Sequence, residues 1–397
     1  MKLLLLALTA LLLPLHARDT APTSPQVAAA MQRCINDGTI AGAVTLFAHD
    51  GQILSFEATG LADLASKRPI KKDDLFWIAS MTKPVTALAI MMLHEEGKLS
   101  IDDPVEKHLP EFTGQLLIQQ KTAAQTILVK PARPVTLKDL LTHTSGLVSA
   151  SPLDRDALDV LTLKEAVITY ALSPLQFEPG SKWAYCNPGI NTLGRVVEVV
   201  SGQEYARFLD QRLFKPLGMK DTTFWPGKKD LARIPTSYKA AADGKTLEPV
   251  AIKYLTPPYS DKKRAPLAAG GLFSTAEDLL KLYQMLLDGG IVKNKRYLRA
   301  ETLALMTRNH TGDLKAGFSD GMGMGLGFQV VKEPVGVTAM LSAGTYGHGG
   351  AHGTQGWIDP TTKSIYILLI QRAGLQPTGD ASTVRQAFQQ AAASLIR

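Results

Sequence analysis

Hydrophobic residues alternate with polar ones near both ends of this chain, whereas the middle follows helical spacing. Close to the start, a helical pattern at 27–35 precedes two strand-like segments, 43–49 and 53–59. Asp50-Gly51 separates these segments, and this pair is typical of a two-residue hairpin turn. The chain is therefore predicted to open as a helix followed by a β-hairpin.

Strand-like patterns return toward the end of the chain. We expect strands in four segments, the last two joined by a turn at Asp359-Pro360: 326–331, 337–341, 353–358 and 365–370. Ser274 and Glu277 have the spacing of a capping box at the start of a preceding helix. A helical pattern over 382–395 closes the chain.

Helical patterns broken by Pro and Gly dominate the middle, and strand patterns are sparse there. We expect a mixed α/β (α+β) fold in which one antiparallel sheet is assembled from both ends of the chain. Its sheet lobe would comprise 18–79 and 265–397, with N- and C-terminal helices covering the sheet. Residues 80–264 would form an inserted all-α region.

The length of the chain indicates its domain organisation, and its first residues indicate where the protein is located. A chain of 397 residues, 45% of them hydrophobic, can bury a core with two lobes around one site. Residues 1–17 are typical of a secretory signal, with Lys2, an apolar run over 3–13 and a small residue before cleavage. That run is too short to span a bilayer. We therefore expect one domain at 18–397, periplasmic or secreted, without a membrane span after signal removal.

Charge and cysteine content exclude some functions. The formal net charge is +7 at pH 7, but the basic residues are scattered, so no nucleic-acid-binding surface is indicated. Cys34 and Cys186 are the only cysteines. An oxidising compartment permits pairing, but one cysteine falls in the first predicted helix and the other in a later motif. We expect two free thiols.

Ser80-Met81-Thr82-Lys83 places a hydroxyl and an amine three residues apart beside a helical pattern over 84–94. Neighbours at i and i+3 on a helix have Cβ atoms about 5–6 Å apart, so the amine can reach the hydroxyl. A neutral lysine can accept the proton of a serine and make it a nucleophile. The alternative is an N-capping serine with a lysine in solvent.

Two later motifs are weaker when taken alone. Tyr185-Cys186-Asn187 combines a phenol that can relay protons with an amide that can donate and accept, in a loop of the helical middle. The glycines of His348-Gly349-Gly350-Ala351 let a substrate approach the backbone, whose N–H groups can face an oxyanion. A buried turn tyrosine and a flexible connection are the plainer interpretations.

Ser-x-x-Lys, Tyr-x-Asn and His-x-Gly occur in this order across helix, helical insertion and returning sheet. With these motifs the chain resembles the serine β-lactamase and penicillin-binding protein superfamily. The branch is that of class C β-lactamases, D-alanyl-D-alanine carboxypeptidases and related esterases. The resemblance covers nearly all of the mature sequence and is supported by four further segments: 76–79, 140–147, 216–219 and 269–272.

The resemblance implies a role for each motif. Ser80 would be the acylated nucleophile and Lys83 the amine that shares its proton, while Tyr185 would move that proton to the leaving group and activate the deacylating water. Asn187 would hold the acyl-side amide of a substrate. The N–H groups of Ser80 and Ala351 would form the oxyanion hole. The resemblance also implies a reaction that would pass through an acyl-enzyme without metal or cofactor.

One motif departs from the family. Where many relatives have Lys-Thr-Gly, this chain has His348-Gly349-Gly350, the residues expected to line the substrate. A histidine is mostly neutral at pH 7, and glycine offers no hydroxyl, so capture of a substrate carboxylate is weakened. Some carboxypeptidase relatives have histidine here, though followed by threonine. An arginine from elsewhere would compensate.

Other apparent motifs are weaker. Ser319 lies in a Gly-x-Ser-x-Gly match without the strand before it and helix after it that a nucleophile elbow needs. His143 is better explained as a hydrogen-bonded scaffold residue than as a catalytic imidazole. His348 and His352 are four apart but in a glycine-rich stretch, where no helix would align them on a metal.

The sequence therefore predicts an exported serine hydrolase acting on a small-molecule ester or acyl-amide. One alternative is a β-lactamase or D-alanyl-D-alanine carboxypeptidase, acting on a β-lactam or a cell-wall peptide. Another is a non-catalytic sensor that binds cell-wall fragments or β-lactams. The sequence specifies neither the acyl group, nor the leaving group, nor the oligomeric state.

Overall fold

The computed structural model describes residues 21–151, 153 and 157–396, so the expected signal at 1–17 lies outside the described residues. One sheet, ordered β12-β13-β14-β15-β16-β1-β2-β3, joins strands from both ends of the chain through antiparallel pairing of β1 with β16. Its strands are β1 (Gly42–His49), β2 (Gln52–Asp63), β3 (Arg68–Pro69), β12 (Met322–Met324), β13 (Gln329–Val331), β14 (Tyr346–Gly349), β15 (Gln355–Asp359) and β16 (Ser364–Leu369). The predicted sheet is confirmed.

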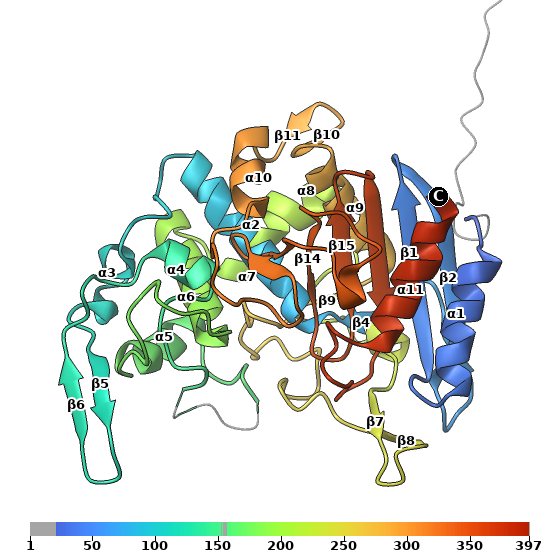
Figure 1. Cartoon of the computed structure of the whole chain (residues 1–397), viewed down its shortest axis with the longest axis horizontal. Coiled ribbons are helices and arrows are strands. Elements are labelled where there is room, and N and C mark those ends of the chain that lie inside the picture. Colours follow the sequence, from blue (N-terminus) through green and yellow to red (C-terminus); the bar gives the residue numbers. More distant parts are fainter. Residues whose placement is uncertain (1–20, 152, 154–156, 397) are drawn as a thin grey trace, which may run out of the picture.

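Helices cover both faces of this sheet. The terminal helices α1 (Pro25–Asn36) and α11 (Thr383–Ala393) pack against each other on one face (Figure 1). On the other face, α9 (Ala276–Leu287) packs against β1, β15 and β16. Successive residues Leu46 and Phe47 of β1 therefore enter different apolar clusters on opposite faces, as the two-residue strand period requires.

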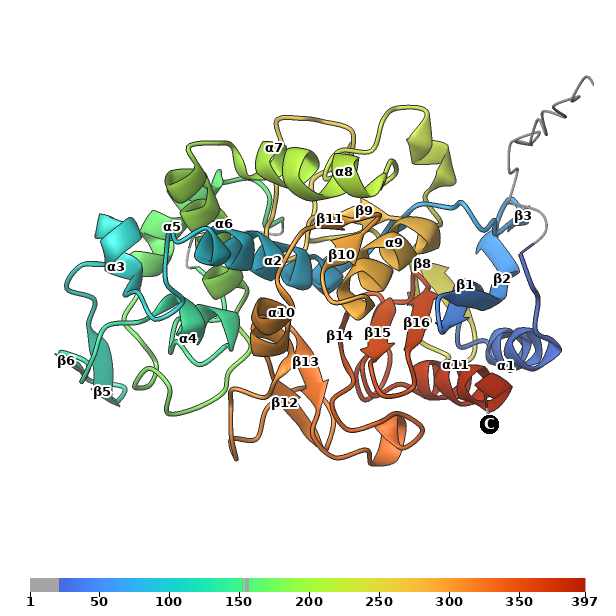
Figure 2. The ribbon, with the colours of Figure 1, turned by 90° about the horizontal axis from the view of Figure 1, so that it is seen from above.

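Helix α2 (Thr82–Glu95) passes through the middle of the molecule, with α7 and α8 on one side and α10 on the other (Figure 2). Its residues from Thr82 to Leu93 are all buried, which suits a helix that is apolar all round. The other helices are α3 (Val105–His108), α4 (Leu137–Leu141), α5 (Leu163–Ala171), α6 (Asn187–Ser201), α7 (Tyr205–Leu209), α8 (Lys215–Leu217) and α10 (Ala300–Thr307).

The inserted region is not wholly helical, which corrects the prediction. It contains two hairpins, and the first projects from the helical part in Figure 1. Most of the residues in these strands are exposed, so they need no alternating apolar face, and the sequence pattern shows little of them. The strands are β5 (Leu117–Lys121), β6 (Thr126–Val129), β7 (Tyr238–Ala240) and β8 (Leu247–Pro249). Four more short strands are β4 (Phe76–Trp77), β9 (Phe273–Ser274), β10 (Ile291–Val292) and β11 (Lys295–Arg296).

Two local predictions are also wrong. Residues 337–341 do not form a strand, because Thr338 bonds back to Val335 and closes a 3-10 turn at Gly336–Thr338. The cap of α9 is Thr275, whose Oγ1 accepts from the N–H of Asp278, whereas Ser274 belongs to β9. The first hairpin and both terminal helices are confirmed.

The described residues contain neither a membrane-spanning helix nor a disulfide. Across 21–151, 153 and 157–396, the helices are too short or too polar for any of them to span a bilayer. Cys34 is half-buried and Cys186 is buried, and both thiols are free, as predicted.

Close packing around α2 gives the first testable prediction. Gly327 has φ +77°, and a Cβ there would overlap the Cβ of Ala87 on α2. Gly97, just beyond the end of α2, has φ +71° but open space around it. Gly97→Ala should cost about 1 kcal/mol for the left-handed backbone alone. Gly327→Ala should cost roughly 2–4 kcal/mol, because overpacking is added. Urea unfolding measures both, and equal losses would contradict the packing argument.

Candidate active site

Ser80 lies in a single 3-10 turn, Ala79–Met81, directly before α2. Ala79 has φ +46°, a left-handed conformation that is uncommon for a residue with a Cβ. Lys83, in the first turn of α2, places its Nζ 3.2 Å from Ser80 Oγ and 2.5 Å from the carbonyl oxygen of Ala269. The residue before α2 is Met81, and no side chain caps this helix. The alternative of a capping serine with a solvent lysine is therefore wrong.

Burial sets the charge of the amine. The Lys83 side chain is fully buried, and desolvation lowers its pKa to about 7. A large part of the lysine population is therefore neutral at pH 7. A neutral amine in contact with a serine hydroxyl can accept its proton.

Tyr185 completes the contacts around the hydroxyl. It lies in the loop before α6, and its phenol donates a hydrogen bond to Ser80 Oγ at 2.8 Å. The Nζ of Lys83 lies 4.7 Å from the centroid of its ring. Burial raises the pKa of Tyr185 above its ordinary value, which keeps the phenol protonated as a donor.

His143 supports this loop from behind. Its Nδ1 accepts a hydrogen bond from the N–H of Cys186 at 3.1 Å, and its ring centroid lies 4.7 Å from that of Tyr185. Burial lowers the pKa of His143 well below its usual range. The thiol of Cys186 accepts from the N–H of Gly189 and caps α6, whose first residue is Asn187. These contacts fit the scaffold role expected for His143.

His348, Gly349 and Gly350 run along the other side of Ser80, with His348 and Gly349 in β14. Burial, with a contribution from Lys83, lowers the pKa of His348 to about 4, so its imidazole is neutral at pH 7. The N–H of Gly350 donates a hydrogen bond to the carbonyl oxygen of Thr354 at 2.7 Å. Ala351 follows in the turn and lines the space in front of Ser80.

Ser80 lies where two cavities meet, and Tyr185 and Ala351 also line both of them. The first cavity, of about 290 Å³, is lined by β14 and by the segment before α11: His348, Gly349, Gly350, Gly374, Leu375, Thr378, Gly379 and Asp380, with Phe318. The second, of about 200 Å³, is largely apolar and aromatic: Trp77, Ala79, Leu158, Asn187, Tyr254, Leu267, Ala269 and Gly270. A bond cleaved at Ser80 could therefore have one part in each cavity.

Asp380 is a cavity residue that the sequence did not indicate. Its carboxylate accepts hydrogen bonds from the amides of Gln329, at 3.1 Å, and Gln355, at 3.0 Å. A Cβ built on Gly349 would overlap its Oδ1. Asp380 lies in an irregular stretch before α11, with no motif around it that could have marked it.

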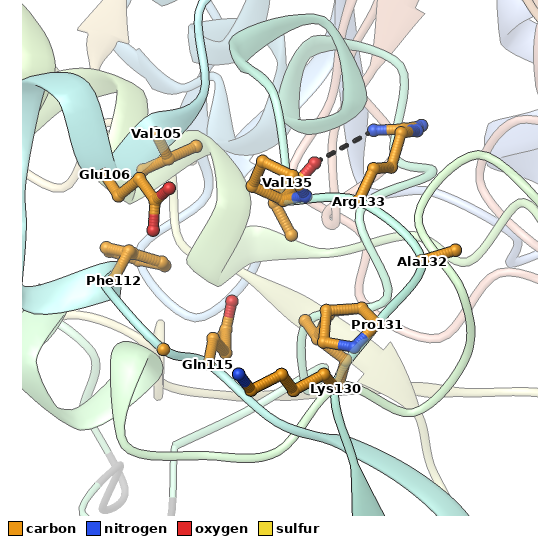
Figure 3. A pocket seen from close by; sticks show the side chains of 12 residues that line it. Val105, Glu106, Phe112, Gln115, Lys130, Pro131, Ala132, Arg133 and Val135 are labelled. Atoms are coloured by element: carbon orange, nitrogen blue, oxygen red, sulfur yellow. Dashed lines mark hydrogen bonds between the residues drawn. The ribbon is translucent and has the colours of Figure 1, made fainter.

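A further cavity, of about 280 Å³, lies away from this cluster, beside α3 and the segment after β6 (Figure 3). Its lining includes Glu106, Lys130 and Arg133, and Arg133 is engaged by Asp139. None of the residues that line it carries a hydroxyl, thiol or imidazole. It therefore offers no second serine, threonine, cysteine or histidine as a nucleophile.

Two other motifs in the sequence, the Gly-x-Ser-x-Gly match at Ser319 and the histidine pair His348 and His352, are not supported as a nucleophile elbow or a metal site. The Oγ of Ser319 is buried without a hydrogen-bond partner, and this serine precedes a strand rather than a helix. The part of the chain that the structure describes contains no group of three His, Cys, Asp or Glu side chains placed to hold a metal ion.

Comparison with known proteins gives a consistent picture. A family model described as Beta-lactamase matches residues 27–390. Esterase EstB of Burkholderia gladioli is 30% identical over 385 residues, covering 89% of this chain and 92% of EstB. Lovastatin esterase of Penicillium rubens is 33% identical over 279 residues, 66% of this chain and 68% of that enzyme. The solved structure of EstCE1, a hydrolase with promiscuous acyltransferase activity, has a TM-score of 0.77 and 28% identity, covering 93% and 97% of the two chains.

The lowered pKa of Lys83 leads to a prediction of how the reactivity of Ser80 depends on pH. Because Lys83 must be neutral to accept a proton and its pKa is about 7, labelling of Ser80 by a fluorophosphonate should rise through pH 7. Below that value the rate should fall about tenfold per pH unit. Lys83→Met, which keeps the buried volume but has no base, should lose this dependence and label slowly. A midpoint near the ordinary lysine pKa of about 10.4 would contradict the prediction.

Proposed function

Because this chain belongs to the beta-lactamase family and is a serine hydrolase, we propose that it hydrolyses carboxylic esters or small acyl-amides through an acyl-enzyme at Ser80. The observation that carries this proposal is the double contact at one oxygen. Lys83 Nζ and Tyr185 Oη both lie within hydrogen-bonding distance of Ser80 Oγ, at the junction of two cavities.

In acylation, the neutral amine of Lys83 accepts the proton of Ser80 as Oγ attacks the substrate carbonyl. The N–H groups of Ser80 and Ala351 would stabilise the oxyanion that forms. Tyr185 then gives its phenolic proton to the leaving oxygen and regains one from the ammonium of Lys83. Because burial raises the pKa of Tyr185, a free phenolate would be unstable there, so the phenol must regain a proton from Lys83 as it gives its own away. A water molecule repeats the sequence in deacylation and releases the acid.

The second cavity suits the acyl group. Trp77, Leu158 and Leu267 give it an apolar lining. Asn187 also lines it, and its amide would bond a polar atom of the acyl part. The proposal therefore includes an apolar acyl chain. Export to the periplasm or the cell exterior depends on residues 1–17 alone and belongs to the same proposal.

Hydrolysis of β-lactams or of D-alanyl-D-alanine peptides is the nearest alternative, since both reactions use the same kind of nucleophile. Both substrates carry a carboxylate that must be bound. The neutral imidazole of His348 and the bare backbone of Gly349 supply neither a cation nor a hydroxyl for it. The geometry therefore favours an ester. The sensor alternative is disfavoured, because simple binding gives no reason to bury an amine against the serine.

Removal of the nucleophile tests this proposal. Ser80→Ala should lower kcat/KM for p-nitrophenyl butyrate by roughly 10³-fold or more, since the acyl-enzyme cannot form. Ser319→Ala, the matched control, should leave the rate within about twofold of the wild type. Intact mass spectrometry should find the acyl adduct in the wild type and not in Ser80→Ala.

Unchanged turnover in Ser80→Ala would reject the proposal. A chromogenic cephalosporin and a D-alanyl-D-alanine peptide, assayed on the same preparation, separate the alternatives. If either is hydrolysed faster than the ester, the β-lactamase or carboxypeptidase activity takes precedence.

A further inference from the structure

The first cavity would receive the leaving group, a step that depends on the proposed function. If the acyl part lies beside Asn187 in the second cavity, the alcohol or amine released from it must lie on the β14 side of Ser80. The chemistry of the first cavity then decides which leaving groups are accepted.

Asp380 dominates that chemistry. Among the residues that line this cavity it is the only Asp, Glu, Lys or Arg. Its side chain accepts hydrogen bonds from two neutral amides, those of Gln329 and Gln355, as an ionised carboxylate does. Among the described residues, no Lys, Arg or His side chain forms an ion pair with this carboxylate.

No nearby basic side chain in the described part of the chain bonds directly to the Asp380 carboxylate, although the buried Arg385 guanidinium interacts with it electrostatically. Arg385 stacks on the ring of Trp357 and donates to the main-chain oxygen of Asp380, not to its carboxylate. His348 is neutral at pH 7. Lys83 lies behind Ser80 and is absent from the cavity lining. Arg385 does not line the cavity, so the charged side chain that a leaving group meets there is the Asp380 carboxylate.

The position of this carboxylate is specific. A Cβ on Gly349 would overlap its Oδ1, so the carboxylate occupies the space where a side chain of residue 349 would begin. The family resemblance places the threonine of Lys-Thr-Gly, a hydroxyl donor, at this position in many relatives. In this chain an acceptor with a full charge has taken that place.

Aromatic rings complete the surroundings of the leaving group. Phe318 and Tyr185 both line the cavity, with ring centroids 4.9 Å apart. Ring faces attract ammonium groups, most strongly where water is excluded. A cavity lined by a carboxylate and two aromatic rings suits a quaternary ammonium ion.

We propose that Asp380 selects leaving groups by charge, favouring esters of cationic alcohols such as amino or quaternary ammonium alcohols, accepting neutral ones, and excluding those that carry a carboxylate. In a partly buried site, unit charges several ångströms apart interact more strongly than they do in water. Such an interaction is enough to change relative rates tenfold or more.

Three butyrate esters test the proposal: those of choline, of 3,3-dimethylbutanol, which has the same shape without the charge, and of 4-hydroxybutanoate. The kcat/KM of each charged ester is divided by that of the neutral ester within each variant, which cancels general effects of a mutation. Asp380→Asn should lower the choline ratio about tenfold and raise the carboxylate ratio about tenfold. Asp50→Asn, which removes an exposed carboxylate in the β1–β2 turn, should leave both ratios as in the wild type.

The wild-type protein provides a measurement that does not depend on the folding of a variant. Choline should inhibit hydrolysis of the neutral ester competitively at about tenfold lower concentration than 3,3-dimethylbutanol, and less so at high salt. Equal inhibition by the two alcohols would overturn the proposal.

The two proposals fail in different ways. If Ser80→Ala abolishes hydrolysis of all three esters but Asp380→Asn leaves both ratios unchanged, the charge selection is wrong and the acyl-enzyme stands. If Ser80→Ala still hydrolyses the esters, both proposals are wrong.

Discussion

The site depends on one buried amine. Lys83 is fully enclosed, yet its Nζ must reach Ser80 Oγ, so the helix that carries it has to be packed on every side. Helix α2 meets this requirement by running between the sheet lobe and the helices around α6 and α7. Without that enclosure the amine would keep its ordinary pKa of about 10.4 and remain protonated at neutral pH. The buried centre of the molecule thus lowers the pKa of Lys83 to about 7, as the proposed role of this lysine as a base requires.

How much the sequence could predict follows from where each interaction lies. The pair of Ser80 and Lys83 is separated by one helical turn, so its contact follows from local geometry. The central strands β1 and β16 could be predicted because both faces of the sheet are covered there and these strands are strongly apolar. Strand β14, which carries His348 and Gly349, has no such pattern and is not among the predicted strands. The hairpin of β5 and β6 is largely exposed, so its sequence carries no alternation of buried apolar and exposed polar residues that would mark it. Asp380 lies beside Gly349 only through tertiary folding, which no local pattern reports.

The two lobes contribute different parts of the site. The helical region supplies Lys83, Tyr185 and Asn187, which would handle the nucleophile, the proton and the acyl group. The sheet and the segment after it supply His348 and Asp380, which face the other cavity. Because these contributions come from separate parts of the chain, the residues around a leaving group can change without disturbing those that activate the serine. Esterases and penicillin-binding proteins among the relatives are compatible with such a division.

The replacement of Lys-Thr-Gly can be understood from this division. The motif His348-Gly349-Gly350 alone indicates a loss, because a cation and a hydroxyl are missing. The structure shows what occupies the space of the missing side chain: the Asp380 carboxylate lies next to Gly349. A threonine at 349 could not be accommodated unless Asp380 moved, and without a glycine there the carboxylate could not hold its present bonds to Gln329 and Gln355. The glycine and the aspartate therefore form one sterically coupled unit, and the altered motif is half of a site whose other half lies before the last helix.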